Sequence, residues 1–143
     1  MPVTSQWIIP NTALHIRISG DFSLHELQQM GTHISTLITR KDNHLVHVIF
    51  DMSEMKQMPH QIKPVYDASQ AFMKHPNIGW VLVSGCNDRI SRMIISMVVQ
   101  MFQTRFRYCQ SIEDALRNLK DIEPGLPISV SWTPPPQPVS WSA

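Results

Sequence analysis

Cys86 is the residue of this sequence best placed for nucleophilic chemistry, because it follows an apolar run and precedes a predicted helix start. Amide groups at a helix N-terminus lower the pKa of a thiol toward that of a reactive thiolate. Nucleophilic catalysis also needs a base within hydrogen-bond distance, and the sequence offers neither a nearby histidine nor the glycine pattern of a nucleophile elbow. We therefore predict an unreactive small side chain at position 86.

Carboxylates and histidines are the other groups that could support chemistry. Asp51 and Glu54 form a close acid pair, which general acid–base catalysis would use, but we interpret them as charges that face water. Metal ligands must converge, and of the seven histidines only His44 and His47 have a suggestive spacing, on a loop and a strand. We predict no catalytic residue, no metal and no cofactor, and we interpret His47 as a core histidine whose hydrogen bonds are satisfied.

Methionines recur at every third position after a buried strand, at Met52, Met55 and Met58, and His60 follows shortly after them. Ligands of open α/β sheets bind beyond the carboxyl ends of the strands, so these side chains could line the mouth of a ligand site. The alternative is a loop that packs back on its own core.

The segment 89–103 is the most informative one for function. At 100 degrees per residue its apolar side chains cover an arc of roughly 240 degrees, whereas a helix that lies on a sheet needs a stripe of about 100 degrees or somewhat more. Part of the arc should therefore face something other than the core, and Met93, Met97 and Met101 belong to it. Two uses stay open, a self-association surface and an apolar ligand pocket; a wide core contact is the third interpretation.

The elements that position these residues alternate between strands and helices. A capping box of Ser23 and Glu26 predicts the first helix, which we expect to end near Arg40 and Lys41. We expect strands over 7–9, 13–18, 45–50, 78–83 and 106–109, and helices over 23–41, 62–73, 88–105 and 111–123. This order predicts an α/β protein with helices packed on a mostly parallel sheet.

Length and composition limit the domain count and the compartment. The 143 residues suffice for one domain, which we place at 5–123, and a proline-rich tail over 124–143 without charged residues, extended or disordered. An edge strand over 128–132 is a minority alternative. A net charge of +1 argues against nucleic acid, two cysteines without close spacing point to the cytoplasm, and no apolar stretch is long enough to span a membrane.

The order of elements, with a buried strand ending at Asp51, Met52 and Ser53, resembles the STAS domain of bacterial anti-sigma factor antagonists and sulfate transporters. The resemblance covers about residues 5–122 and also includes Gly20 and the segment 105–116. It implies a mostly parallel sheet of four to five strands with about four helices. Where phosphorylatable members have a serine, counting from Asp51 gives the segment 58–61, Met-Pro-His-Gln, which has no hydroxyl group to phosphorylate.

We therefore expect a STAS-like regulatory or scaffold module that is not an enzyme and acts through protein contacts, including contacts with its own copy as a homodimer. The alternative is a domain that binds an apolar small molecule or lipid with the methionine-rich loop and the third helix. An enzyme that uses Cys86 or Asp51 is the least favoured reading. The predicted binding surface consists of Asp51, Met52, Ser53, Met55, Met58, His60, Met93, Met97 and Met101.

Overall fold

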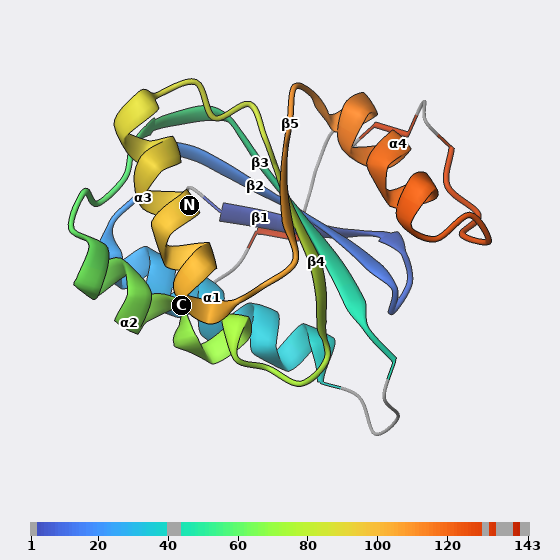
Figure 1. The fold of residues 1–143 in the computed structure, drawn as a ribbon, viewed down its shortest axis with the longest axis horizontal. Coiled ribbons are helices and arrows are strands. Elements are labelled where there is room, and N and C mark those ends of the chain that lie inside the picture. Colours follow the sequence, from blue (N-terminus) through green and yellow to red (C-terminus); the bar gives the residue numbers. More distant parts are fainter. Residues whose placement is uncertain (1–2, 40–43, 130–131, 134–138, 141–143) are drawn as a thin grey trace.

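The order of strands and helices follows the predicted alternation. The computed structural model describes residues 3–39, 44–129, 132–133 and 139–140. In chain order its elements are β1 (Val3–Ile9), β2 (Ala13–Asp21), α1 (Leu24–Ile38), β3 (Val46–Gln57), α2 (Ile62–Met73), β4 (Ile78–Ser84), α3 (Arg89–Phe102), β5 (Phe106–Cys109), α4 (Ile112–Ile122) and β6 (Val139–Ser140). Figure 1 shows them along the chain.

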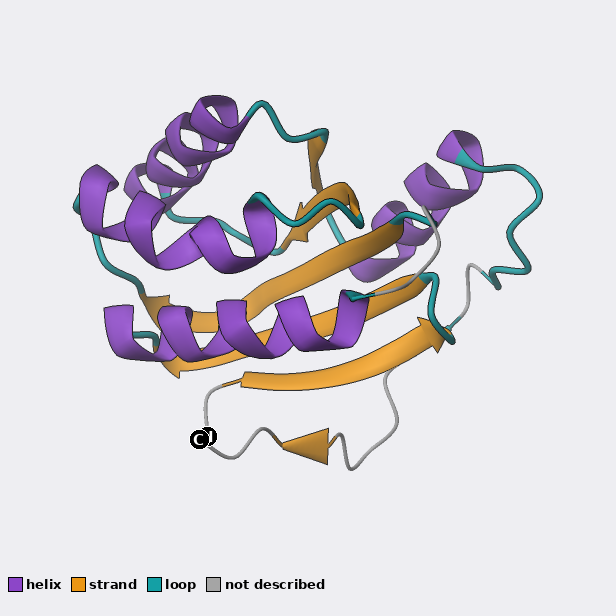
Figure 2. Cartoon of the chain, turned by 90° about the horizontal axis from the view of Figure 1, so that it is seen from below, coloured by secondary structure: helices purple, strands orange, loops and turns teal. Residues whose placement is uncertain are grey.

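The sheet has the strand order β5-β4-β3-β2-β1-β6. The neighbours from β2 to β5 are parallel, whereas β1 is antiparallel to β2 and to β6. This arrangement confirms the predicted α/β class and the mostly parallel sheet with four helices. The edge strand β6 pairs with β1 over two residues (Figure 2).

Two apolar clusters form on opposite faces of the sheet, because successive side chains of a strand point in opposite directions. Leu14, Ile16 and Ile18 of β2 pack with buried residues of α1, α2 and α3. Ala13 belongs to the second cluster, with residues of α4. The helices α1, α2 and α3 accordingly gather on one side of the sheet and α4 lies on the other (Figure 1).

Helix starts were the best predicted local features. Ser23 accepts a hydrogen bond from the Glu26 amide at 3.1 Å, and the Glu26 carboxylate accepts one from the Ser23 amide at 3.0 Å, so the capping box is confirmed. Asp88 caps α3, Ser111 caps α4, and Pro64 lies in the first turn of α2, where its missing amide hydrogen costs nothing. Helix α1 ends at Ile38 and Thr39 is its extended C-cap, so the predicted end near Arg40 and Lys41 is about two residues too late.

Strand β3 is longer than predicted. The expected strand ended at residue 50 and a loop followed, but the structure continues the strand to Gln57. Its pairing with β2 contains two irregularities, because Arg17 pairs with Asp51, Ser19 with Glu54 and Asp21 with Gln57. The inserted residues bend the strand and shift its alternation. As a result Met52 and Met55, three positions apart, both line the α1–α3 side of the sheet.

The segment after α4 contacts the second cluster. Ile128 is buried there, and Leu126 and Trp132 pack against it. The alternative edge strand over 128–132 includes residues 130–131, which lie outside the described residues, as does the proline-rich stretch 134–138. The domain bounds 5–123 and the tail over 124–143 stay predictions.

Candidate functional site

The outer face of α3 carries an apolar surface that the core does not cover. Ile94, Val98 and Val99 point inward and are buried. The exposed large hydrophobic side chains among the described residues all lie on this one helix, with 43–53 % of their surface accessible; they are Ile90, Met93, Met97 and Met101, and we call them the α3 stripe. On a helical projection they share an arc of roughly 80 degrees. The expectation that part of the apolar arc faces away from the core is confirmed.

The charged side chains within α3 itself are all basic. Helix α3 contains Arg89 and Arg92 near its start and no carboxylate, and its last turn contains no basic residue. The Arg92 guanidinium lies 4.5 Å from the centre of the Tyr108 ring, whose hydroxyl donates a hydrogen bond to the Arg92 carbonyl and accepts one from Ser96. Arg92 is thus held against β5, whereas Arg89 is exposed beside the stripe.

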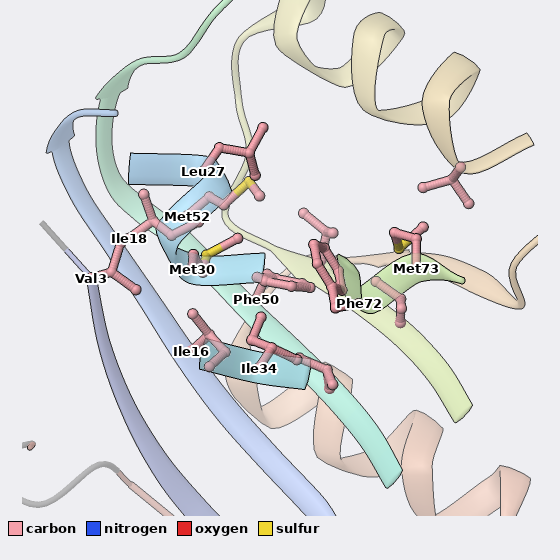
Figure 3. Packing of buried hydrophobic residues seen from close by; sticks show 14 of the residues in the cluster. Val3, Ile16, Ile18, Leu27, Met30, Ile34, Phe50, Met52, Phe72 and Met73 are labelled. Atoms are coloured by element: carbon pink, nitrogen blue, oxygen red, sulfur yellow. The ribbon is translucent and has the colours of Figure 1, made fainter. Parts of the chain in front are cut away.

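A cavity of about 70 Å³ lies under α3, between this helix, α1, α2 and the sheet. Its lining is apolar except for one residue and includes five methionines; it consists of Ile18, Phe22, Leu27, Met30, Phe50, Met52, Met55, Met58, Val65, Ser69, Phe72, Met73, Val81, Val83, Ile95, Val98, Val99 and Phe106. Figure 3 shows Met30, Met52 and Phe72 in this layer beside the sheet.

The size of this apolar cavity limits what it holds in the present conformation. Pockets for drug-sized ligands measure about 300–1,000 Å³, and an engineered apolar cavity of about 150 Å³ accommodates benzene. At about 70 Å³ the cavity has room for only a few heavy atoms. Methionine side chains rearrange readily, so a larger apolar guest requires the lining to move apart.

The nine predicted surface residues do not form one site. Met52, Met55 and Met58 line the apolar cavity, whereas Met93, Met97 and Met101 lie on the opposite, outer side of α3. Asp51 belongs to the other face of the sheet, where its carboxylate also holds Ser53. His60 lies at the start of α2, with its Nε2 3.7 Å from the Asp88 carboxylate.

The interpretation of Asp51 as a charge that faces water is wrong: only 3 % of its surface is accessible, and it links β2 to β3. Its Oδ2 accepts hydrogen bonds from Arg17 Nη2 at 3.2 Å and Nε at 3.3 Å, and its Oδ1 accepts from the Ser53 amide at 3.0 Å and hydroxyl at 2.7 Å. Burial raises the pKa of Asp51, but nearby His15, the Ser53 hydrogen bonds and the Arg17 charge together hold that pKa well below its usual range. The carboxylate therefore stays ionised, and its lone pairs are already engaged.

Polar groups beside Asp51 were not anticipated from the sequence. The His15 ring is buried, and its Nε2 lies 3.8 Å from Asp51 Oδ2, beyond hydrogen-bond distance. The Trp132 ring covers it at a centroid distance of 5.2 Å. Within the described part of the chain, His15 Nε2, Ser84 Oγ and Gln6 Oε1 are buried without a hydrogen-bond partner. These three residues lie on different strands. Once the pairing of the strands is known, the alternation of side chains along each strand shows which of them face the protein interior.

Cys86 and His47 have the roles that the sequence predicted. Burial raises the pKa of the Cys86 thiol, so that the thiol stays protonated at neutral pH. The His47 Nδ1 accepts a hydrogen bond from the Trp80 amide at 3.0 Å, and its Nε2 lies 2.7 Å from a Glu123 carboxylate oxygen. These contacts satisfy the imidazole and join β3 to β4 and to the end of α4.

Comparisons with known proteins identify the fold. No protein-family model matches the chain, and no curated protein sequence matches it. Among solved structures the chain is similar to an uncharacterised protein of the DUF3478 family with a SpoIIAA-like fold, from Shewanella loihica PV-4. The two share 14 % identity with a TM-score of 0.58 over 82 % of this chain and 91 % of that chain.

This likeness establishes the fold and confirms the resemblance inferred from the sequence. The chain has a SpoIIAA-like fold, which is the fold of anti-sigma factor antagonists and STAS domains. A separate finding concerns the membrane: of the helices in the described ranges, each is too short or too polar to serve as a transmembrane span.

Proposed function

We propose that this protein is a non-catalytic regulatory or scaffold module that acts through protein contacts made by the α3 stripe, including contacts with its own copy. The observation that carries the proposal is that the exposed large apolar side chains of the described residues gather on a single helix face. Scattered single apolar residues on a surface need no explanation, whereas a contiguous group marks an interaction site.

The energetics favour a contact surface of moderate strength. With about half of each side chain accessible, the four residues of the α3 stripe expose roughly 100 Å² each, which corresponds to about 10 kcal/mol when all of it is buried. Association costs about 4–15 kcal/mol in lost translational and rotational freedom. The stripe alone therefore supports reversible binding, as a regulatory contact requires.

The non-catalytic part of the proposal rests on the state of two groups. Asp51 is ionised and its oxygens are occupied by Arg17 and Ser53, so it has no proton to donate and little capacity to accept one. The thiol of Cys86 is buried and protonated. Free cysteines also suit a reducing compartment, and we place the protein in the cytoplasm.

Site-specific photo-crosslinking in cells tests the protein-contact proposal. A benzophenone amino acid replaces Met97 in one variant and Thr32, an exposed residue of α1, in the control variant. We expect discrete protein adducts from position 97 and none of the same mass from position 32. The adducts should disappear when Met93→Lys is added, because a charge next to the probe opposes burial. Absence of adducts from every position of the α3 stripe would contradict the proposal.

The apolar cavity supports a second candidate function, the binding of an apolar small molecule or lipid. The lining is apolar apart from Ser69, and its methionines can adapt to a guest. Native mass spectrometry of freshly purified protein gives the stoichiometry and any retained molecule in one spectrum. A retained apolar molecule that is lost on Val98→Phe, which narrows the cavity, supports this candidate; a protein that carries nothing after extraction and does not take up an apolar dye argues against it.

A further inference from the structure

We propose that the α3 stripe pairs with the α3 stripe of a second copy in an antiparallel arrangement around a twofold axis. The inference rests on the proposed function, since it names the partner of the same surface and fixes the orientation of the contact. It is carried by the distribution of charge along α3 and by the symmetry of the stripe.

The charges of α3 are placed against its own dipole. The N-terminal end of a helix is its positive end, and cations are favourable at the opposite end. Here Arg89 and Arg92 occupy the first turn or two, where the only acidic group is the N-cap Asp88, while the last turn contains no basic residue. The positive N-terminal end of α3 therefore lies beside two arginine charges, and its negative C-terminal end has no basic residue in the last turn.

An antiparallel second copy supplies a charge of opposite sign at both ends. It brings the negative end of its own α3 beside Arg89, and the twofold axis repeats the contact at the other end. A parallel copy would instead place the two Arg89 side chains against each other. Arg92 contributes less, because its guanidinium lies over the Tyr108 ring. Arg105 lies three residues beyond the end of α3, and its backbone carbonyl accepts a hydrogen bond from the Val81 amide of β4.

The stripe itself is compatible with a twofold axis. Its members are spaced by three, four and four residues, the spacing used by nearly aligned helices, in which an i±3 ridge of one packs into an i±4 groove of the other. With the axis between Met93 and Met97, Met93 lies opposite the partner's Met97, and Ile90 lies opposite the partner's Met101. The most exposed apolar side chains of each copy are then covered by those of the other.

The available area predicts a weak dimer. The α3 stripe offers about 400 Å² per protomer, below the ~800 Å² per partner of a standard stable interface. Association should therefore depend on concentration in the micromolar range or above, and the monomer should be the main form in dilute solution.

Disulfide trapping between variants that each carry one introduced cysteine tests the orientation. Positions 90 and 101 are about 16 Å apart along the helix, whereas a disulfide needs Cα atoms within about 7 Å. Ile90→Cys protein mixed with Met101→Cys protein should give a crosslinked dimer, and Met93→Cys should crosslink to Met97→Cys. Ile90→Cys alone and Thr32→Cys, an exposed control on α1, should give no disulfide-linked dimer. Native Cys86 and Cys109 are buried, and the wild-type protein controls for them.

Charge reversal at the helix start gives a second test whose sign depends on the orientation. Arg89→Glu improves the match with the dipole of its own helix, so the monomer should fold at least as well as the wild type. Because the twofold axis repeats every contact, the substitution removes two contacts between residue 89 and the negative end of the other copy's α3. The dissociation constant measured by sedimentation should therefore rise roughly 3- to 30-fold. In a parallel dimer the same change removes repulsion and should lower that constant.

The outcomes separate this inference from the proposed function. Crosslinking of Ile90→Cys with itself, or tighter association of Arg89→Glu, overturns the antiparallel pairing. A protein that is monomeric at millimolar concentration overturns self-association altogether. In either case the photo-crosslinking experiment at Met97 still decides whether the α3 stripe binds another protein.

Discussion

Filling the apolar cavity should stabilise the protein, because added methylene groups are buried against an almost wholly apolar lining. Val83 of β4 and Val98 of α3 both line it, and both are buried. The double substitution Val83→Ile and Val98→Ile adds two methylene groups. Each is worth about 0.8 kcal/mol on burial, so the free energy of unfolding should rise by about 1.6 kcal/mol.

The cavity volume sets an independent ceiling on this gain. Residual cavity volume costs about 24 cal/mol per Å³, and a cavity of about 70 Å³ therefore lowers the free energy of unfolding by about 1.7 kcal/mol. The expected gain of about 1.6 kcal/mol lies just within this ceiling. With a urea m-value of about 1.5 kcal/mol/M, the midpoint should move up by about 1 M.

Urea unfolding followed by tryptophan fluorescence measures this shift. The matched control is Val48→Ile, because Val48 is fully buried on the same face of the sheet but does not line the cavity. Overpacking there should cost about 1–3 kcal/mol. If the double variant loses as much stability as the control, the lining has no room for two further methylene groups, and the reasoning about an adaptable cavity under α3 is refuted.

Three further predictions concern the links in the sheet and the exposed helix face. Gly79→Ala should lower the free energy of unfolding by about 2–4 kcal/mol, because the new Cβ would lie 2.6 Å from Nδ1 of His47, which accepts a hydrogen bond from the Trp80 amide. Calorimetry measures this loss, and a loss under about 0.5 kcal/mol would contradict the prediction. Asp51→Asn should cost about 2–4 kcal/mol at pH 7, because Arg17 loses its charged acceptor. The folded pKa of Asp51 lies below its unfolded value, so this stabilisation is present above about pH 4 and is lost as the pH falls through the folded pKa. Denaturation curves should show that the difference in unfolding free energy between Asp51→Asn and the wild type becomes smaller as the pH falls below about 4. A difference that grows in acid would contradict this prediction. Met97→Lys should change the monomer's unfolding free energy by less than about 0.5 kcal/mol, because the side chain is exposed, and a larger loss would show that Met97 belongs to the core.

Local features of the fold were predictable because short-range interactions decide them. The Ser23–Glu26 capping box and the Asp88 cap use hydrogen bonds within a few residues, so their sequence patterns determine where α1 and α3 begin. The excess of apolar side chains on α3 was equally visible, since helical periodicity fixes which residues share a face.

Features that depend on strand pairing were not predictable from local pattern. The extension of β3 to Gln57 is stabilised by pairing with β2, and the irregularities in that pairing bring Met52 and Met55 to one face. Treating this stretch as a loop placed Asp51 beside the methionines, whereas a strand sends neighbouring side chains to opposite faces. The candidate site was therefore predicted as one surface and is divided by the sheet and by α3.

The segment after α4 shows the same limit. Trp132 lies over His15, more than a hundred positions away in the sequence, and Ile128 joins a cluster with α4 and the sheet. Neither contact leaves a periodic pattern in a proline-rich stretch. Only the folded arrangement shows that Trp132 covers His15 beside Asp51.

Methionine methyl NMR tests most directly whether the α3 stripe is the contact surface. The experiment uses protein labelled with ¹³C at the methionine methyl groups and compares spectra over a hundredfold range of concentration. The methyl signals of Met93, Met97 and Met101 should shift together as the copies associate, while those of the buried Met30 and Met73 stay in place. Signals of the three exposed methionines that remain unchanged over the whole range, with shifts confined to other residues, would contradict the account.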